Sequence, residues 1–388
     1  MTDRGRAGTL GVALIGHAFM GAIHSQAWRT AHRFFDVPLT PRLVVLGGRD
    51  ERRTREAADR FGWADVETDW RAVVERDDVD LVDICTPGDT HAPIALAALA
   101  AGKHVLCEKP LANTVAEAER MAEAAERARA HGVRSMVAFN YRRVPALALA
   151  RRLVATGRLG QVRHVRAVYL QDWLSDAAAP MTWRLRREQA GSGALGDLGA
   201  HIVDAAQFVT GAHITGVSGF TETFVPRRRG QDGAEEDVTV DDCAVFTARL
   251  SSGAVATFEA TRYALGRKNG LRIEVNGSRG SLAFDFESMN ELWFHDGDEP
   301  SATAGFRRIV VTEPEHPYLA AWWPPGHGLG YEHTFTHEIA DLLTAIGAGE
   351  DPEPGFTDGL RVQRVLDAVQ RSAADNARWT PVPFAAGP

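Results

Sequence analysis

The stretch Leu10-Gly-Val-Ala-Leu-Ile-Gly16-His-Ala-Phe-Met-Gly21 decides the fold of this 388-residue chain. Its first half is a short apolar run that ends in glycine, which is typical of a strand buried on both faces of a parallel sheet. Its second half has the glycine spacing of a dinucleotide-binding turn, with Ala18 in place of the middle glycine. We therefore expect a helix from about Gly21, whose first N–H groups face a pyrophosphate. A tight turn without a ligand is the alternative.

Short apolar runs alternate with alanine-rich stretches as far as residue 143. The predicted strands are 10–16, 42–46, 79–85, 104–107 and 135–139, and the predicted helices after the first are 51–61, 91–101 and 114–131. This alternation is typical of a doubly wound parallel sheet with helices on both faces. Residues 1–143 are therefore predicted to form an α/β Rossmann domain.

Beyond residue 143 the pattern changes. A helix is predicted over 146–156, and strands that alternate in the antiparallel manner over 161–173, 216–225, 240–250, 254–264, 271–275 and 281–286. The glycine-containing stretch 276–280 joins the last two as a hairpin loop. Helical periodicity returns at 331–348 and 358–376. Residues 144–388 are therefore predicted to form an α+β domain, with C-terminal helices that pack back.

Composition excludes several classes of protein. A hydrophobic content of 45% and a charged content of 24% are typical of a folded globular protein. No apolar run approaches the roughly 20 residues of a membrane span, and the first ten residues lack a signal-peptide core, so we expect a cytoplasmic protein. Cys85, Cys107 and Cys243 have no CxxC spacing, which argues against a disulfide framework or a zinc site. The net charge of −8 disfavours nucleic acid, and Arg227-Arg-Arg229, followed by acidic residues, is expected to be a solvated loop.

The second predicted strand ends in Leu46-Gly-Gly48-Arg49-Asp50. An acidic residue there would bind the ribose diol of NAD, but glycine occupies the likeliest position. Arg49 would suit the 2′-phosphate of NADP, or be a solvated strand-end arginine, and Asp50 is a second candidate for the ribose. The sequence leaves the choice between NAD and NADP open.

Thr86 and Pro87 follow the strand 79–85 directly, where the carboxyl ends of parallel strands open onto a ligand crevice. His91 begins the next helix. Its ring either faces the cofactor or lies on the surface at the helix start.

Lys109, Asp197 and His201 are the candidates for chemistry. Lys109 follows an apolar strand and precedes a proline, so it is expected at a sheet edge, where its ammonium could orient and polarise a hydroxyl; a surface lysine is the alternative. The i, i+4 spacing of Asp197 and His201 places them on one helix face. There the carboxylate would orient an imidazole that accepts a hydroxyl proton, unless Asp197 is only a helix cap. His333, His337 and Glu338 are too few on one helix to indicate a metal site.

Taken in order, these motifs resemble the glucose-fructose oxidoreductase, inositol dehydrogenase and MocA family of NAD(P)-dependent oxidoreductases. The resemblance covers nearly the whole chain. It rests on the nucleotide turn, Cys85-Thr-Pro87 with His91, the stretch 101–105 leading to Glu108-Lys-Pro110, Phe139-Asn-Tyr-Arg-Arg143, Trp183-Arg184, and the segment from Asp197 to His201.

The resemblance implies roles for these residues. Lys109, Asp197 and His201 form the catalytic set, and Glu108 lies with Lys109 beside the nicotinamide ribose. The implied cofactor-binding residues are Gly16, Ala18, Phe19, Met20, Gly21, Arg49, Thr86, Pro87, His91, Glu108, Lys109, Trp183 and Arg184. The second domain is implied to carry an open, predominantly antiparallel sheet used for oligomer contacts, as in a homodimer or homotetramer.

Stretches outside the shared core resemble the sugar dehydrogenases of that family, among them Tyr169-Leu-Gln-Asp-Trp173, Val240-Asp-Asp242 and His316-Pro-Tyr318. They imply hydride transfer between nicotinamide and a secondary hydroxyl of a sugar, at C3. The candidate substrate-binding residues are Lys109, Tyr141, Gln171, Trp173, Asp197 and His201, with Asp172, Trp183 and Arg184 as further candidates. The alternatives are an inositol dehydrogenase and a dinucleotide-binding regulatory protein without catalysis.

Overall fold

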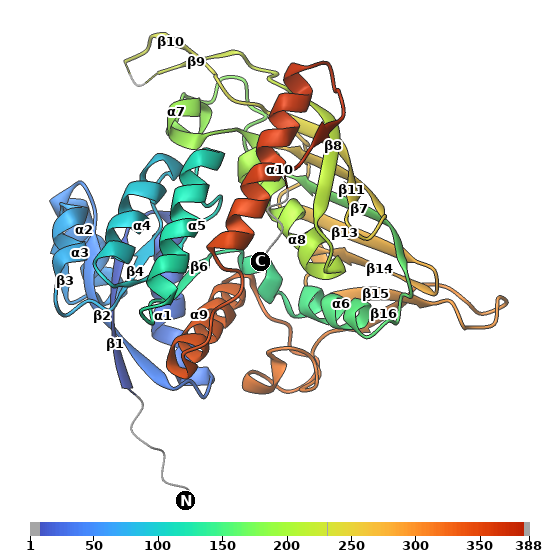
Figure 1. Cartoon of the computed structure of the whole chain (residues 1–388), viewed down its shortest axis with the longest axis horizontal. Helices are drawn as coiled ribbons and strands as arrows, with labels where there is room; N and C mark the ends of the chain where they lie inside the picture. The colour runs from blue at the N-terminus through green and yellow to red at the C-terminus, as the bar shows by residue number, and fades with distance from the viewer. Residues whose placement is uncertain (1–7, 231, 384–388) are drawn as a thin grey trace, which may run out of the picture. The chain divides into compact units, whose positions relative to one another are not determined.

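The computed structural model describes residues 8–230 and 232–383. The chain divides into two compact units (Figure 1). The first consists of Met1–Asn140 and Gly330–Leu360, and the second of Tyr141–Leu329 and Arg361–Pro388. The segment Gly330–Leu360 thus belongs to the first unit, whereas the sequence-based division at residue 143 assigned it to the second.

The first unit contains a six-stranded parallel sheet in the order β3-β2-β1-β4-β5-β6. Its strands are β1 (Gly8–Ile15), β2 (Leu39–Gly47), β3 (Asp65–Glu67), β4 (Leu81–Ile84), β5 (His104–Cys107) and β6 (Ser135–Val137). Apolar side chains along these strands are fully buried, among them Val12, Leu81 and Val105. The predicted Rossmann fold is confirmed. The short strand β3 was not predicted.

The helices of the first unit are α1 (Phe19–Phe34), α2 (Glu51–Phe61), α3 (Trp70–Glu75), α4 (His91–Ala100), α5 (Val115–Arg129) and α9 (Tyr331–Ala348). Helix α1 begins two residues before the predicted start at Gly21. Helix α9 packs against α1, and its side chains Phe335 and Leu342 join the same apolar cluster as Leu14 and Trp28. The core that supports the nucleotide turn is therefore completed by a helix from near the C-terminus.

The second unit is built on a nine-stranded sheet in the order β16-β15-β14-β13-β7-β12-β11-β8-β17. Its strands are β7 (Val162–Leu170), β8 (Ile214–Glu222), β11 (Cys243–Leu250), β12 (Val255–Thr261), β13 (Gly270–Gly277), β14 (Gly280–Asp285), β15 (Glu291–Asp296), β16 (Arg307–Val310) and β17 (Thr380–Pro381). All neighbouring pairs are antiparallel except β7 with β12. The predicted α+β domain is confirmed, although β15 and β16 were not predicted.

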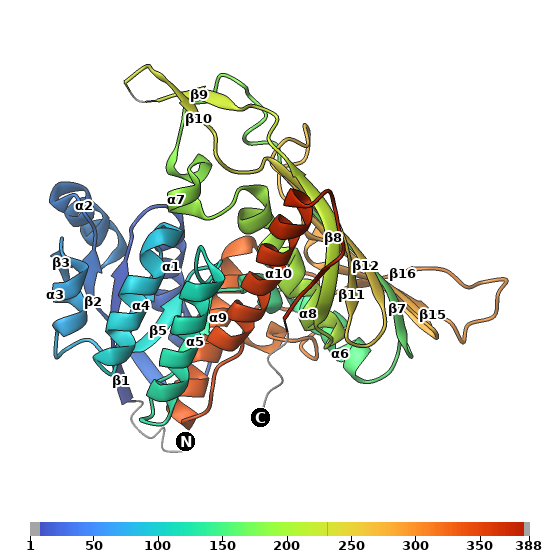
Figure 2. The same ribbon diagram turned by 45° about the horizontal axis from the view of Figure 1, so that its top comes forward.

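Helices α6 (Pro145–Ala155) and α8 (Ala200–Thr210) pack on this sheet (Figure 2). The short helix α7 (Arg187–Ala190) also belongs to this unit, and α10 (Phe356–Ala374) runs from the first unit into the second. Buried and outward residues alternate along the strands, so that Phe246 and Phe258 stack in the core while Phe220 on β8 is 59% exposed. Val255 and Trp293 are also exposed, so the outward face carries apolar side chains.

The basic cluster Arg227–Arg229 is not the solvated loop that the sequence predicted. It forms β9, which pairs antiparallel with β10 (Glu235–Asp237). Arg228 is buried and donates to the carbonyl oxygens of Leu174, Asp176 and Ala179 at 2.8–3.0 Å. Alternation along a strand turns the middle arginine inward, where backbone carbonyls satisfy it.

In the ranges 8–230 and 232–383 we find no helix that combines the length and the apolar character of a membrane span. Cys85, Cys107 and Cys243 form no disulfide.

Candidate active site

The nucleotide turn depends on its two glycines. Gly16 has a φ of 102°, and a Cβ atom there would lie 2.5 Å from the carbonyl oxygen of Cys85. At Gly21 a Cβ atom would lie 1.9 Å from the carbonyl oxygen of Gly16. A positive φ and two backbone contacts this close leave room for glycine alone. The turn is therefore built for close backbone packing at the start of α1.

The N-terminus of α1 is open. Ala18 occupies the N-cap position, and no side chain in the described part of the chain caps this helix. Its first N–H groups and the partial positive charge of the helix can therefore receive an anion. Phe19, which is 64% exposed, stacks over Tyr331 of α9 with ring centroids 6.3 Å apart. This geometry fits the pyrophosphate of a dinucleotide.

At the end of β2, the space next to Gly48 is filled. A Cβ atom at Gly48 would lie 2.4 Å from Thr54 Oγ1 and 2.6 Å from His17 Cδ2. The carboxylate of Asp50 caps α2 by accepting the Arg53 N–H at 3.0 Å. Arg49 is exposed. Asp50 thus serves as a helix cap. Arg49 is the side chain at this strand end for which the contacts above give no structural role.

His91 links the two loops that follow β4 and β5. Its Nδ1 lies 3.0 Å from the Pro110 carbonyl oxygen and its Nε2 lies 2.9 Å from that of Thr86. The interpretation of His91 as a surface residue is wrong, because its side chain is buried at the start of α4. It fixes the backbone next to Thr86 and Pro87, the two residues predicted to face the cofactor.

Lys109 follows β5 and is half-buried. Its N–H donates to Oε2 of Glu108 at 3.0 Å. The other oxygen of Glu108, Oε1, lies 3.1 Å from Nε2 of His24, which in turn contacts Asp83. The sequence indicated Glu108 and Lys109 but assigned no role to His24 or Asp83, because nothing in their spacing shows that α1, β4 and β5 bring them together.

Asp197 and His201 do not share one regular helix. Asp197 lies in a π-helical turn, Leu195–Gly199, and His201 lies in the first turn of α8. The interpretation of Asp197 as a helix cap is also wrong. Instead Asp241 accepts the Gly193 and Leu195 N–H groups, both at 2.8 Å. A carboxylate more than forty residues away therefore shapes the turn that carries Asp197.

His201 is buried beside two tyrosine rings. Its ring centroid lies 4.6 Å from that of Tyr141 and 5.8 Å from that of Tyr169. The two tyrosine hydroxyls lie 2.7 Å apart, and Tyr169 Oη donates to Asn269 Oδ1 at 2.6 Å. Gln171 Nε2 also donates to Asn269 Oδ1, at 2.9 Å. We call Tyr141, Tyr169, Gln171 and Asn269 the hydroxyl–amide cluster; sequence reasoning missed Asn269, which no motif marked.

The remaining substrate candidates have other neighbours within the second unit. They are Asp172, Trp173, Trp183 and Arg184. Asp172 accepts from Lys268 Nζ at 2.7 Å. The exposed ring of Trp173 lies 5.4 Å from the guanidinium of Arg262, and Arg184 lies over the ring of its neighbour Trp183 at 4.5 Å. None of these contacts places them in the hydroxyl–amide cluster.

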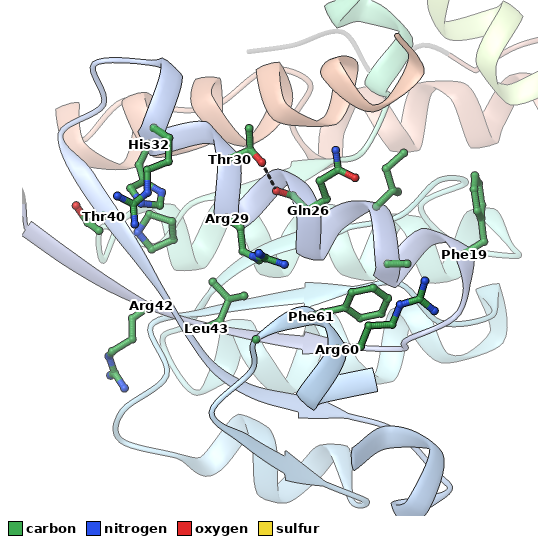
Figure 3. Close-up of a pocket in the computed structure, with 15 residues that line it drawn as sticks. Phe19, Gln26, Arg29, Thr30, His32, Thr40, Arg42, Leu43, Arg60 and Phe61 are labelled. Atoms are coloured by element: carbon green, nitrogen blue, oxygen red, sulfur yellow. Dashed lines mark hydrogen bonds between the residues drawn. The ribbon is translucent and has the colours of Figure 1, made fainter. Parts of the chain in front are cut away.

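The first unit contains an open cavity of about 1150 Å³. Figure 3 shows the residues that line it. It lies beside α1, the start of β2 and the end of α2. Arg29 projects toward its centre, whereas Arg42 points away from it (Figure 3). Phe19 is the one residue of its lining that the sequence predicted to bind the cofactor, so this cavity does not coincide with the predicted nucleotide site.

Within residues 8–230 and 232–383, one group of potential metal ligands has its ligand atoms within 4.8 Å of one another: His24, Asp83 and Cys85. His333 accepts the Gly330 N–H through Nδ1, while the buried His337 packs against the ring of Phe35.

The chain matches two models of known families. Residues 10–139 match the model described as "Oxidoreductase family, NAD-binding Rossmann fold", and residues 147–283 match the "GFO/IDH/MocA C-terminal domain". Levoglucosan dehydrogenase of Pseudarthrobacter phenanthrenivorans is 39% identical over 96% of this chain and 98% of that protein.

Solved structures are similar over nearly their whole length. An oxidoreductase domain protein from Kribbella flavida has a TM-score of 0.95 and 64% identity, with 97% of this chain and 100% of that chain covered. A levoglucosan dehydrogenase in complex with NADH and levoglucosan has a TM-score of 0.93 and 40% identity, again with 97% and 100% covered.

Proposed function

Because the chain belongs to the GFO/IDH/MocA family of oxidoreductases, we propose that it oxidises a levoglucosan-like sugar at its C3 hydroxyl, with NAD as the hydride acceptor. The observation that carries this proposal is the hydroxyl–amide cluster beside His201. Hydroxyl and amide groups can both donate and accept hydrogen bonds, as recognition of a polyol requires. The similarity to levoglucosan dehydrogenase supports the same substrate class.

In the proposed reaction, His201 accepts the proton of the substrate hydroxyl while hydride leaves the same carbon for nicotinamide C4. Asp197 stabilises the imidazolium that forms, and Lys109 orients and polarises the hydroxyl oxygen. Ketone reduction uses the same groups in reverse. The burial of His201 against two tyrosine rings supports this role, because a fixed imidazole is an effective general base.

NAD is the proposed cofactor, bound through the turn from Gly16 to Gly21 and the loops carrying Thr86, Pro87 and Glu108. The NADH bound to levoglucosan dehydrogenase supports this choice. Arg49 is the one residue at the end of β2 that would favour NADP, through the 2′-phosphate. Trp183 and Arg184 remain proposed cofactor contacts on the strength of the resemblance alone.

A homo-oligomer is proposed as well. The outward face of the nine-stranded sheet carries Phe220, Val255 and Trp293 exposed among charged side chains. Large exposed apolar groups on one sheet face are typical of an interface, and self-association is the commonest way to cover them.

The first experiment is a panel of sugars and polyols, including levoglucosan and inositol, assayed with NAD and NADP separately by nicotinamide absorbance. We expect turnover with levoglucosan and NAD, and a 3-keto product by NMR spectroscopy. Preference for inositol would support the alternative that the protein is an inositol dehydrogenase. Cofactor binding without turnover on the whole panel would instead support a regulatory protein.

The second experiment tests the proposed catalytic residues. H201A and K109M should each lower kcat by roughly 10²–10⁴-fold, the usual contribution of a positioned acid–base group. The dissociation constant of NAD, measured by calorimetry, should stay near that of the unmodified protein for H201A. H131A, at an exposed histidine, is the control. Rates close to normal in both variants would overturn the assignment.

A further inference from the structure

A continuous chain of hydrogen bonds runs through the interior of the first unit. Trp28 Nε1 donates to Asp83 Oδ2 at 2.7 Å, and the same oxygen lies 2.9 Å from His24 Nδ1. His24 Nε2 lies 3.1 Å from Glu108 Oε1, and Glu108 Oε2 accepts the Lys109 N–H at 3.0 Å. His24 is 1% exposed, Asp83 is fully buried and Glu108 is 5% exposed. The chain thus connects helix α1 to the backbone of Lys109.

The two ring nitrogens of His24 each face a carboxylate. An ionised carboxylate only accepts hydrogen bonds, so only an imidazolium can donate to both. Burial acts to lower the pKa of His24, but the charge of Asp83 and the hydrogen bonds around the ring outweigh it and raise the pKa well above its usual value. Further neighbours of the ring include the Cys85 thiol after β4 and the ring of Phe335 on α9, 5.3 Å away.

The same cluster offers three metal ligands, but its atoms are already engaged. His24 Nδ1 is bonded to Asp83, and Asp83 also accepts from Trp28 and from the Cys85 thiol, whose sulfur lies 3.6 Å from Oδ1. Burial raises the pKa of Cys85, which keeps it a thiol rather than a metal-binding thiolate. The donors and acceptors therefore satisfy one another.

We propose that His24 and Asp83 are positioning residues that hold the Glu108 carboxylate, and through it the backbone of Lys109, in the orientation that the reaction needs. This rests on the proposed function, because it takes Lys109 as the group that polarises the substrate hydroxyl. Both oxygens of Glu108 are fixed, one by His24 and one by Lys109. Loss of the imidazolium would remove the positive charge that stands between the carboxylates of Asp83 and Glu108.

A double-variant cycle tests this coupling. H24Q and E108Q should each lower kcat by about 10–100-fold, because a displacement of the order of 1 Å in a reacting group costs about that much. The double variant H24Q/E108Q should be no slower than the slower single variant, since both act on one contact. Multiplicative losses would show that His24 acts independently of Glu108 and would overturn the proposal.

The pH profile supplies a readout that a purely structural role would not change. H24Q should lose kcat at a higher pH than the unmodified protein, beyond the acid loss that the general base His201 causes in both, because the variant lacks the positive charge that favours an ionised carboxylate at position 108. The double variant, which has no carboxylate at 108, should lack this additional loss. A profile for H24Q parallel to that of the unmodified protein would contradict the proposal.

The matched control is W63F, which removes a different buried hydrogen bond to α1, from Trp63 Nε1 to Ser25 Oγ at 3.0 Å. It should lower the melting temperature and leave kcat within about twofold, the range of a neutral substitution far from the chemistry.

A second measurement needs neither a variant nor a substrate. ¹⁵N NMR spectroscopy of the unmodified protein at pH 8 should show both nitrogens of one buried imidazole protonated, and a neutral ring would overturn the proposal. If no sugar on the panel is oxidised, by contrast, the proposed function is wrong. The NMR result on the protonation of the imidazole would still hold.

Discussion

The nucleotide turn has no room for a side chain at Gly21. A methyl group in its place would lie 1.9 Å from the Gly16 carbonyl oxygen, so the backbone of the turn or of α1 must shift. We expect G21A to lose about 1–3 kcal/mol of stability, the usual cost of overpacking. NAD binding should weaken, because the first N–H groups of α1 move with the helix.

Thermal unfolding and calorimetric titration with NAD would measure both effects. G305A is the matched control, because a Cβ atom there meets nothing within 4 Å. Equal melting temperatures for the two variants would contradict the structure of the turn.

The cysteines should be unreactive in the folded protein. Burial raises the pKa of Cys85 and of Cys107, and it raises the pKa of Cys243 to about 11. The thiolate is the reactive species, so all three should stay protonated at pH 8. Titration with a disulfide reagent at pH 8 should therefore detect thiols only after denaturation. Rapid reaction of any thiol in the folded state would disprove this.

His24 also gives stability a dependence on pH. Its pKa is raised in the folded state, so the stabilisation is complete below about pH 6.5, the unfolded value, and is lost as the pH rises through the folded-state pKa. Melting temperatures measured from pH 6 to 10 should fall toward the alkaline end. H24Q should have a lower melting temperature at pH 6 and a flatter profile, and an identical slope would contradict the assignment.

At the scale of elements, the π-helical turn Leu195–Gly199 depends on Asp241. Each oxygen of its carboxylate accepts one backbone N–H, and the side chain is buried. D241N replaces one acceptor by a donor, so a buried N–H loses its partner at a cost of about 1–3 kcal/mol. Activity should fall with stability, because the same turn carries Asp197.

Thermal unfolding and kcat of D241N would be compared with D298N. Asp298 makes an exposed ion pair with Arg279, and an ion pair this exposed contributes little to stability. A loss of stability in D241N no larger than in D298N would refute the capping role.

Elements with local signals could be predicted from the sequence. Helix α2 matches its predicted range because Asp50 caps its start and Gly62, in a left-handed conformation, ends it. Helix α9 ends in the same way at Gly349. β3, with the sequence Asp-Val-Glu, has too few apolar residues to stand out, and the π-helical turn requires a carboxylate from a distant segment. Elements that are stabilised by nearby residues can therefore be predicted from the sequence. Elements that depend on tertiary contacts cannot.

The candidate site could be predicted where motifs are contiguous. Glu108 and Lys109 form part of one motif, and so do Asp197 and His201. His24, Asp83 and Asn269 come from separate strands, helices and loops, and only the folded chain brings them to their partners. A single sequence carries no local mark of such contacts.

At the scale of the whole molecule, the outward sheet face predicts self-association. V255E places a charge on that face, at the first residue of β12, and should shift the protein to a smaller mass in light scattering, because a charge buried in an interface is strongly unfavourable. L265E is the control, since Leu265 is 82% exposed outside the strands of the sheet. An unchanged mass for V255E would exclude this face as the interface.

The crowding around Gly48 constrains the order in which cofactor preference can evolve or be engineered. His17 and Thr54 occupy the space that an acidic side chain at position 48 would need. G48D introduced first would clash before it could bind a ribose, whereas the same substitution made after smaller residues at positions 17 and 54 would meet less obstruction. The benefit of an acidic residue at position 48 thus depends on the residues at positions 17 and 54, so a path that begins with G48D passes through a sterically strained intermediate.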